Sequence, residues 1–165
     1  MKPRAPATDA SSSVSEFPPI RELIPHAGPM VLLERVLAHD EDTTSSSIAI
    51  AEQRIFRDPD GSIPVWFGIE YMAQCIAVHA ALVRRAGGEL EPPRGFLVGA
   101  RGLRFHVERF GAAQYLVAMA RRRRAGSQSL VSFECELRDA DGGKLLAEGR
   151  LNCFMLPTGV GLERA

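Results

Sequence analysis

The sequence predicts an α+β fold, in which a curved antiparallel sheet of about five to six strands wraps around one long central helix. Three observations indicate this arrangement. Residues 63–85 form a long and almost entirely apolar stretch, which is typical of a buried helix. Strand-like segments lie before this stretch, and every segment after it has strand-like alternation. Antiparallel strands with one apolar face need a cover, and only one helix is available to provide it.

The composition is that of a single globular domain. The chain has 165 residues, of which 45% are hydrophobic, and its 20 basic and 20 acidic residues cancel. A general attraction to nucleic acid or to an anionic membrane is therefore not expected. We expect a disordered tail at residues 1–16, one domain at 17–157 and a C-terminal tail at 158–165.

Two kinds of site are not indicated by the sequence. The three cysteines, Cys75, Cys135 and Cys153, lack metal-like spacing, which fits reduced, buried thiols in a cytoplasmic protein. The sequence also lacks a glycine-rich phosphate loop and a G-x-S-x-G motif. We therefore expect no metal and no cofactor, and either cofactor-free chemistry or plain binding.

The first half of the chain predicts two strands before the helix. Residues 20–23 form at most one helical turn before the PHAGP loop. Residues 30–38 are apolar and β-branched enough for a strand, and residues 47–51 alternate as a second strand. The polar link between these two strands is expected to be a turn, and residues 57–62 a loop.

The central helix is predicted over residues 63–85. Gly87 and Gly88 follow as a C-cap signal, and the charges of Arg84 and Arg85 suit a helix C-terminus. Polar residues and a proline inside the apolar stretch argue against a membrane span.

The second half of the chain predicts four strands. They are expected at residues 95–105, 115–120, 131–138 and 145–155. The second of these strands is apolar on both sides and should be covered on both faces, whereas the third has one wet face. The breaks AGSQ and DADGG are expected to be hairpin loops. This plan is the hot-dog fold, and its exposed helix and sheet edge lead us to expect a dimer.

Glu70 is the strongest candidate for a site residue. It is the only charged residue between Asp60 and Arg84. Burial of a carboxyl group raises its pKa, which suits a general acid, and a carboxyl group here could instead position a water molecule. The alternative is a helix-start carboxylate stabilised by backbone N–H groups. Gln74 lies one turn later on the same face, where it either orients Glu70 or a bound water or simply hydrogen-bonds in the core.

Three motifs resemble one enzyme family. GIEYMAQ (68–74), IPHAGPMVLLERV (24–36) and GLRFHVERF (102–110) are similar, in order and spacing, to segments of the β-hydroxyacyl-acyl-carrier-protein dehydratases. PHAGPM together with GIEYMAQ resembles the divergent branch found in aryl polyene clusters. The resemblance extends over roughly residues 19–156.

The resemblance implies dehydration of 3-hydroxyacyl thioesters on an acyl carrier protein to trans-2-enoyl thioesters, in fatty-acid-like or aryl polyene synthesis. It also implies a site at a dimer interface, in a homodimer or a heterodimer with another hot-dog subunit. One departure is clear. The main family has a catalytic histidine in a loop about fourteen residues before the helix acid, where this chain has Phe56.

His26 is the candidate replacement base, because a neutral imidazole suits removal of a weakly acidic proton. Its alternative is a loop histidine that packs locally, since the equivalent histidine is not the base in the main family. His79, nine residues after Glu70, lies on the opposite side of the helix and is expected to pack. His39 is expected to be solvated, and His106 is a third candidate for the site.

The helix start is the expected place for substrate contacts. Backbone N–H groups near Gly68 are positioned to polarise a thioester carbonyl. Phe67 and Gln74 complete the predicted substrate-binding residues, and an aromatic side chain there would line an acyl tunnel. The basic run at residues 121–124 either steers an acidic carrier protein or blunts a sheet edge. Two alternative functions remain open: an acyl thioesterase on the same fold, and a non-catalytic partner subunit.

Overall fold

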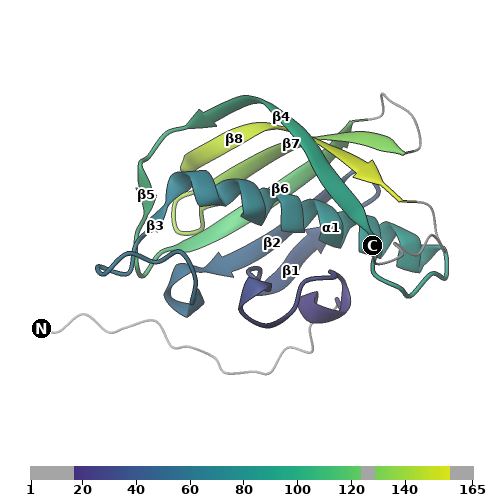
Figure 1. The fold of residues 1–165 in the computed structure, drawn as a ribbon, viewed down its shortest axis with the longest axis horizontal. Coiled ribbons are helices and arrows are strands. Elements are labelled where there is room, and N and C mark those ends of the chain that lie inside the picture. Colours follow the sequence, from purple (N-terminus) through teal and green to yellow (C-terminus); the bar gives the residue numbers. More distant parts are fainter. Residues whose placement is uncertain (1–16, 124–128, 157–165) are drawn as a thin grey trace, which may run out of the picture.

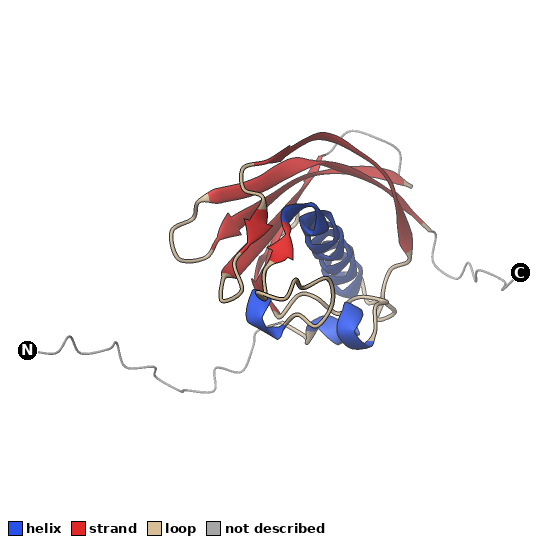
Figure 2. Ribbon diagram, turned by 60° about the vertical axis from the view of Figure 1, so that its left-hand side comes forward, coloured by secondary structure: helices blue, strands red, loops and turns tan. Residues whose placement is uncertain are grey.

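The computed structural model describes residues 17–123 and 129–156. A six-stranded antiparallel sheet curves around one long helix, α1 (Gly68–Ala86), as Figures 1 and 2 show. The strand order is β1 (Arg35–His39), β2 (Thr43–Ala49), β6 (Tyr115–Arg123), β7 (Leu130–Asp139), β8 (Leu145–Met155) and β4 (Gly95–Phe105). This architecture confirms the predicted hot-dog fold.

Shorter elements lie next to the start of the helix and in the N-terminal part of the described chain. The strands β3 (Ile63–Pro64) and β5 (Arg109–Phe110) pair with each other. The described 3₁₀ helices are η1 (Ile20–Glu22), η2 (Gly28–Met30), η3 (Ile50–Glu52) and η4 (Val65–Phe67). The predicted tails at 1–16 and 158–165, and the predicted AGSQ loop, lie outside the described residues.

Helix α1 is the centre of the core. Tyr71, Met72, Cys75 and Val78 are fully buried, and the helix packs on β2, β6 and β7. The stretch Val65–Ala86 is apolar enough to cross a membrane by length and composition, with a mean hydropathy of 1.3, but 67% of its most apolar window is buried inside this fold. Burial beneath a sheet accounts for that composition, as in other buried core helices.

Both ends of the helix follow from the local sequence. A Cβ atom on Gly68 would lie 2.5 Å from Leu137 Cδ1 and 3.1 Å from Phe110 Cζ, so glycine permits this close approach. At the other end the Gly87 N–H donates to the carbonyl of Arg84, and Gly88 has φ +89°. The predicted glycine C-cap is therefore confirmed.

The first two strands differ from their predicted bounds. Residues 30–34 are not part of β1, because η2 and an extended segment tied to the helix occupy them. Strand β2 begins at Thr43, within the stretch predicted as a polar turn. Thr44 and Ser46 are fully buried, and the Cys75 thiol of the helix donates to the Thr44 carbonyl. Polarity alone was misleading here because Cys75 and His79, the helix partners of Thr44, lie more than thirty residues away.

The remaining strands fit the predicted pattern more closely. Strands β4, β7 and β8 form close to their predicted bounds, and β7 shows the predicted alternation, whereas β4 is an edge strand exposed along almost its whole length. The predicted DADGG turn closes with a bond from Gly143 N–H to the Asp139 carbonyl. Strand β6 was expected to be covered on both faces. Only the face with Leu116, Ala118 and Ala120 is buried, whereas Tyr115 is 52% exposed. That second face is therefore only partly covered within one chain.

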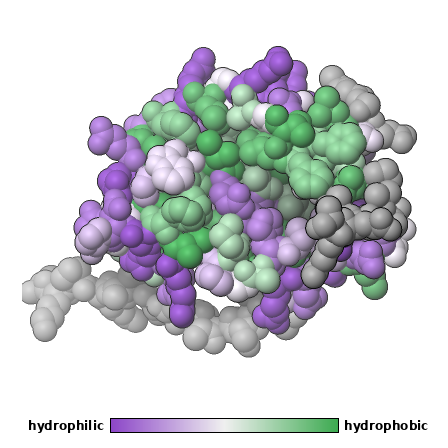
Figure 3. Space-filling view, in the orientation of Figure 1, coloured by the Kyte–Doolittle hydropathy of each residue, from purple (hydrophilic) through white to green (hydrophobic). Residues whose placement is uncertain are grey.

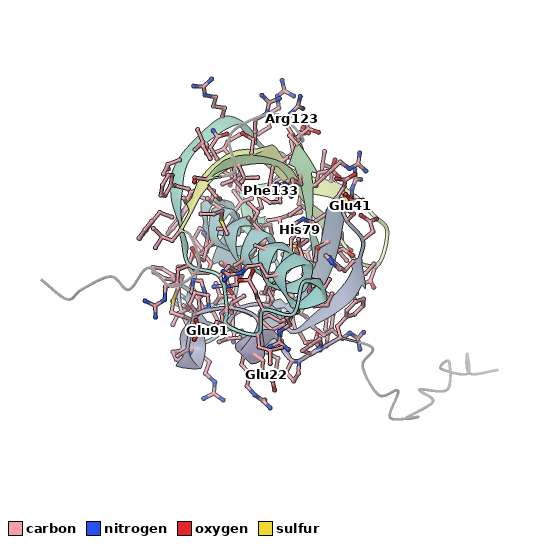
Figure 4. All side chains as sticks on the ribbon, turned by 90° about the vertical axis from the view of Figure 1, so that its right-hand side faces the viewer. Glu22, Glu41, His79, Glu91, Arg123 and Phe133 are labelled. Atoms are coloured by element: carbon pink, nitrogen blue, oxygen red, sulfur yellow. The ribbon has the colours of Figure 1, made fainter. Side chains whose placement is uncertain are left out.

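A polar chain of three side chains lies between the helix and β2. The Thr44 hydroxyl is 2.7 Å from His39 Nδ1 and 2.8 Å from His79 Nδ1. His79 is buried, as predicted, and its ring lies 5.5 Å from the Phe133 ring (Figure 4). His39 was expected to be solvated, but it is half-buried because it pairs with Thr44.

Acid should weaken the fold through His79. Burial, followed by repulsion from His39 and Arg122, lowers the pKa of His79 from 6.5 to about 4. Between these values the unfolded chain binds a proton that the folded chain does not, so the free energy of unfolding falls as the pH drops from 6.5 toward 4. The full shift is worth roughly 3 kcal/mol. Denaturant titrations at several pH values should show that the free energy of unfolding of the native chain depends on pH with this slope. The slope should be much smaller in His79→Gln. The exposed control His106→Gln should keep the native slope, and an equal slope in both variants would contradict the assignment.

Candidate active site

The structure brings His26 and Glu70 together within one chain. His26 Nε2 lies 3.3 Å from Glu70 Oε1, and the two side chains are 30% and 31% exposed. His26 comes from the loop between η1 and η2, and Glu70 from the first turn of α1. A histidine and a carboxylate at this distance form the central elements of many acid–base sites.

The side chain of Gln74 fixes this arrangement through hydrogen bonds. Its Nε2 donates to Glu70 Oε1 at 2.9 Å and to the carbonyl of Met30 at 2.7 Å. Its Oε1 accepts from the backbone N–H of Leu32 at 3.0 Å. Gln74 is fully buried, so one side chain orients the carboxylate and also ties the segment after His26 to the helix. The predicted orienting and structural roles of Gln74 are therefore both present.

Glu70 does not have the raised pKa expected from burial alone. Burial does push its pKa upward, but the hydrogen bonds from His26 and Gln74 and the attraction to His26 outweigh it and hold the pKa below its usual range. The sequence argument failed here because it treated the carboxyl as unpaired. Glu70 is therefore ionised near neutral pH and accepts hydrogen bonds.

The protonation pattern of His26 follows from that charge. An ionised Glu70 oxygen only accepts, so His26 Nε2 carries the hydrogen of this bond. In the neutral ring the lone pair then lies on Nδ1. This nitrogen is buried and has no hydrogen-bond partner among the described residues. A carboxylate that fixes the tautomer and leaves the other nitrogen basic is a well-known arrangement for proton abstraction.

A cavity of about 170 Å³ adjoins the pair. Its helix wall consists of Ala73, Ile76 and Ala77, and its sheet wall includes Phe96 and Leu97 of β4. These walls are mainly apolar, and the titratable groups in the lining are His26, Glu70 and the Cys153 thiol. The shape and polarity fit an acyl chain whose polar end reaches the pair.

The three predicted substrate-binding residues do not line this cavity. Phe67 is buried in an aromatic cluster, with its ring 4.6 Å from that of Phe56 and 5.4 Å from that of Tyr71. The Gly68 N–H already donates to carbonyls of the preceding turn, η4, and is not available to a thioester. The predicted helix start at residue 63 is wrong: Ile63–Pro64 form β3, η4 follows, and α1 begins only at Gly68, so that η4 takes up the Gly68 N–H.

Phe56 occupies the sequence position at which the main dehydratase family has its catalytic base. It has φ +55°, is 56% exposed, and stacks against Trp66 and Phe67. An aromatic side chain cannot remove a proton, so Phe56 cannot serve as the base.

The other polar candidates lie apart from the cavity. His106 Nε2 lies 3.2 Å from Glu148 Oε1, in an exposed pair. Arg121, Arg122 and Arg123 lie on β6, which has neighbours on both sides, so the predicted sheet-edge role is wrong. Arg124 lies outside the described residues. No group of three metal-ligating side chains occurs in residues 17–123 or 129–156.

An apolar surface on β4 was not recognised from the sequence. Phe96, Leu97 and Val98 are 48%, 44% and 57% exposed on this edge strand. Figure 3 shows hydrophobic side chains gathered over the region of β4. The run of three apolar residues, where a wet edge would alternate, was the available signal. An apolar edge of this kind is typical of a subunit interface.

Comparisons with known proteins identify a matching family and fold. Residues 18–160 match the ApeP-like family, described as ApeP dehydratase. A chain of the dehydratase heterocomplex ApeI:P from Xenorhabdus doucetiae is 30% identical, with a TM-score of 0.78 over 86% of this chain and 93% of that chain. A search of curated proteins finds no match.

More distant structures share the fold alone. Zebrafish thioesterase superfamily member 2 is 15% identical, with a TM-score of 0.59 over 84% of this chain and 93% of that chain. The PaaI protein from the phenylacetic acid degradation operon of E. coli is 14% identical, with a TM-score of 0.54 over 72% and 80%. These similarities support the hot-dog architecture and carry no argument about the reaction.

Proposed function

The chain belongs to the ApeP-like dehydratase family, and on this premise we propose that it dehydrates 3-hydroxyacyl thioesters carried on an acyl carrier protein to trans-2-enoyl thioesters. The setting is fatty-acid-like or aryl polyene synthesis in the cytoplasm. The observation that carries the proposal is the 3.3 Å contact between His26 and Glu70 beside an apolar cavity.

In this mechanism His26 is the base. The His26 imidazole takes the proton from C2, the C2–H electron pair becomes the C2=C3 double bond, and the C3–O bond breaks. The imidazolium then returns a proton to the departing oxygen, so that water leaves and the ring is neutral again. The proton balance closes without a cofactor or a second acid.

Glu70 is assigned the orienting role. An ionised carboxylate beside the ring stabilises the imidazolium that forms when His26 takes the proton. This role replaces the general-acid role expected from the sequence, because the pKa of Glu70 is lowered. Gln74 keeps the carboxylate in place through its bond to Oε1.

We further propose that the chain works as one subunit of a pair of hot-dog domains. Similarity to a chain of a dehydratase heterocomplex supports this assembly. The exposed apolar side chains of the edge strand β4 offer the contact surface. The cavity beside His26 is walled by Phe96 and Leu97 of the same strand, so a partner on β4 would complete its open side.

A second candidate function is that of a non-catalytic partner subunit. Phe56, in place of the family's loop base, favours this alternative, together with the similarity to a heterocomplex. In that case the reacting residues would belong to the other subunit, and His26 and Glu70 would only stabilise the fold.

Product analysis separates the alternatives. The purified chain, alone and co-expressed with a hot-dog partner, is incubated with a 3-hydroxyacyl thioester on an acyl carrier protein, and the products are identified by mass spectrometry. We expect an enoyl thioester, 18 Da lighter than the substrate because one water (roughly 18 Da) is lost in the elimination. Free acid and thiol without enoyl product would instead identify a thioesterase. Turnover by the complex that persists without His26 would identify a non-catalytic partner.

A further inference from the structure

Two cavities lie beside successive parts of α1 and have one lining residue in common. The first cavity, at His26 and Glu70, has a volume of about 170 Å³. The second cavity lies beside the C-terminal half of the helix and has a volume of about 160 Å³. Met155 of β8 is the one residue that lines both. Its side chain is therefore the wall that the two cavities share.

The position of Met155 is fixed by the end of the sheet. Met155 pairs with Gly95 in the register of β8 and β4, and its N–H donates to the Ser129 carbonyl at 2.7 Å. A Cβ atom on Gly95 would lie 2.9 Å from Met155 Sδ, so the glycine leaves the room that this side chain occupies. The next residue, Leu156, donates its N–H to the Arg94 carbonyl at 2.9 Å. The backbone that carries the shared wall is thus held on both sides.

An acyl chain whose reacting end lies beside Glu70 would meet Met155 at its other end. Glu70, Ala73 and Ala77 line the first cavity and recur at intervals of three or four residues, so they follow one side of the helix. From Glu70 to Ala77 the helix rises by roughly 10 Å, at about 1.5 Å per residue. The second cavity is lined by Ala80 and later residues of the helix. The shared wall therefore lies at the end of the first cavity that is farther from Glu70.

The second cavity combines apolar walls with basic side chains. Besides Met155, its lining consists of Ala80, Val83, Val131 and Phe133 and of the three basic residues His79, Arg84 and Arg122. Arginine side chains line apolar space with their methylene stems while the charged group faces water. Because the two volumes are nearly equal, removal of the Met155 side chain would roughly double the space open to a hydrocarbon chain.

We propose that Met155 sets the length of acyl chain that the site binds, so that carbon atoms beyond this wall add no affinity. The proposal rests on the dehydratase function proposed above, since it concerns the substrate of the same site. A cavity of about 150 Å³ holds the six carbon atoms of a benzene ring, so the first cavity takes about six carbon atoms beyond C3, or a chain of roughly nine. Met155 is a specificity-determining residue, distant from the reacting carbon atoms.

The test measures binding as a function of chain length, separately from turnover. The full chain, assembled with its hot-dog partner where the complex forms, is titrated with saturated N-acetylcysteamine thioesters of increasing length. These compounds lack the 3-hydroxyl group and cannot be dehydrated. We expect about a fourfold gain in affinity for each added methylene, since its burial is worth about 0.8 kcal/mol. The gain should stop at roughly nine carbon atoms in the native chain.

Three variants identify the residue that causes this limit. In Met155→Ala the gain in affinity should continue for several more carbon atoms. Adding Ala80→Leu to that variant should restore the native limit, because the larger side chain fills the second cavity. Met119→Ala is the matched control, since Met119 is also half-buried but lines neither cavity, and it should keep the native limit. The same limit in Met155→Ala as in the native chain would overturn the proposal.

A direct readout keeps the proposal testable if Met155→Ala does not fold. In the native chain, the methyl resonance of Met155 should shift with thioesters long enough to fill the first cavity and stay in place with an acetyl thioester. A resonance that does not move at any chain length would also overturn the proposal. Failure of the dehydratase function would appear differently, as absent turnover of 3-hydroxyacyl thioesters of every length while the limit in binding persists.

Discussion

His26→Gln is expected to lower the rate of enoyl thioester formation by roughly 10²–10⁴-fold, the usual contribution of a positioned acid–base group. The variant keeps a side chain of similar length that can still donate to Glu70, but it lacks a basic nitrogen. Steady-state assays with a 3-hydroxyacyl thioester on an acyl carrier protein measure the effect. The loss should appear in kcat, since substrate binding in the apolar cavity does not depend on the base.

His106→Gln is the matched control, because His106 also faces a carboxylate but lies in an exposed pair away from the cavity. We expect native turnover in this variant. Circular dichroism and thermal unfolding should show that both variants keep the fold, since the His26 side chain is 30% exposed. Native kcat in His26→Gln would show that the base lies elsewhere, most simply in a partner subunit.

Val98→Lys is expected to separate the chain from its partner subunit while leaving the chain folded. Val98 is 57% exposed on the edge strand β4, so a lysine there is solvated in the free chain. At an interface formed by that edge, the same charge would lose its hydration without a counter-ion, and edge lysines are known to block strand pairing. Light scattering should show a fall from the mass of the pair to that of one chain.

Turnover should fall together with the mass in Val98→Lys, because the open side of the His26 cavity would lose its cover. Leu90→Lys is the control, since Leu90 is also an exposed apolar residue, at 71%, but precedes β4 in a loop. It should leave the mass unchanged. An intact pair in Val98→Lys would place the interface on another surface.

The fold was predictable because its main signals are local. The apolar run of α1 and the alternation in β7 and β8 depend on residues close together in sequence. The start of β2 was missed for the opposite reason. The Thr44 hydroxyl meets the nearby His39 and also His79 of the helix, 35 residues away, and the distant helix partner has no local signature.

The site was predictable only in part. Glu70 stood out as a lone charge in an apolar run, and His26 was identified by elimination. The contact between them depends on Gln74, which reaches Met30 and Leu32 over more than forty residues. The same partners reversed the expected direction of the Glu70 pKa. The cavity walls at Phe96 and Leu97 require the curvature of the whole sheet, which no local pattern specifies.

The most direct test of the central claim is the turnover of a mixed complex in which only this chain has Glu70→Gln and the hot-dog partner is native. The substitution keeps the size and hydrogen-bonding reach of the side chain but removes the charge that orients His26 and stabilises its imidazolium. If the His26–Glu70 pair performs the elimination, formation of the enoyl thioester should fall by roughly 10²-fold or more. Native turnover in this complex would contradict the account and assign the chemistry to the partner.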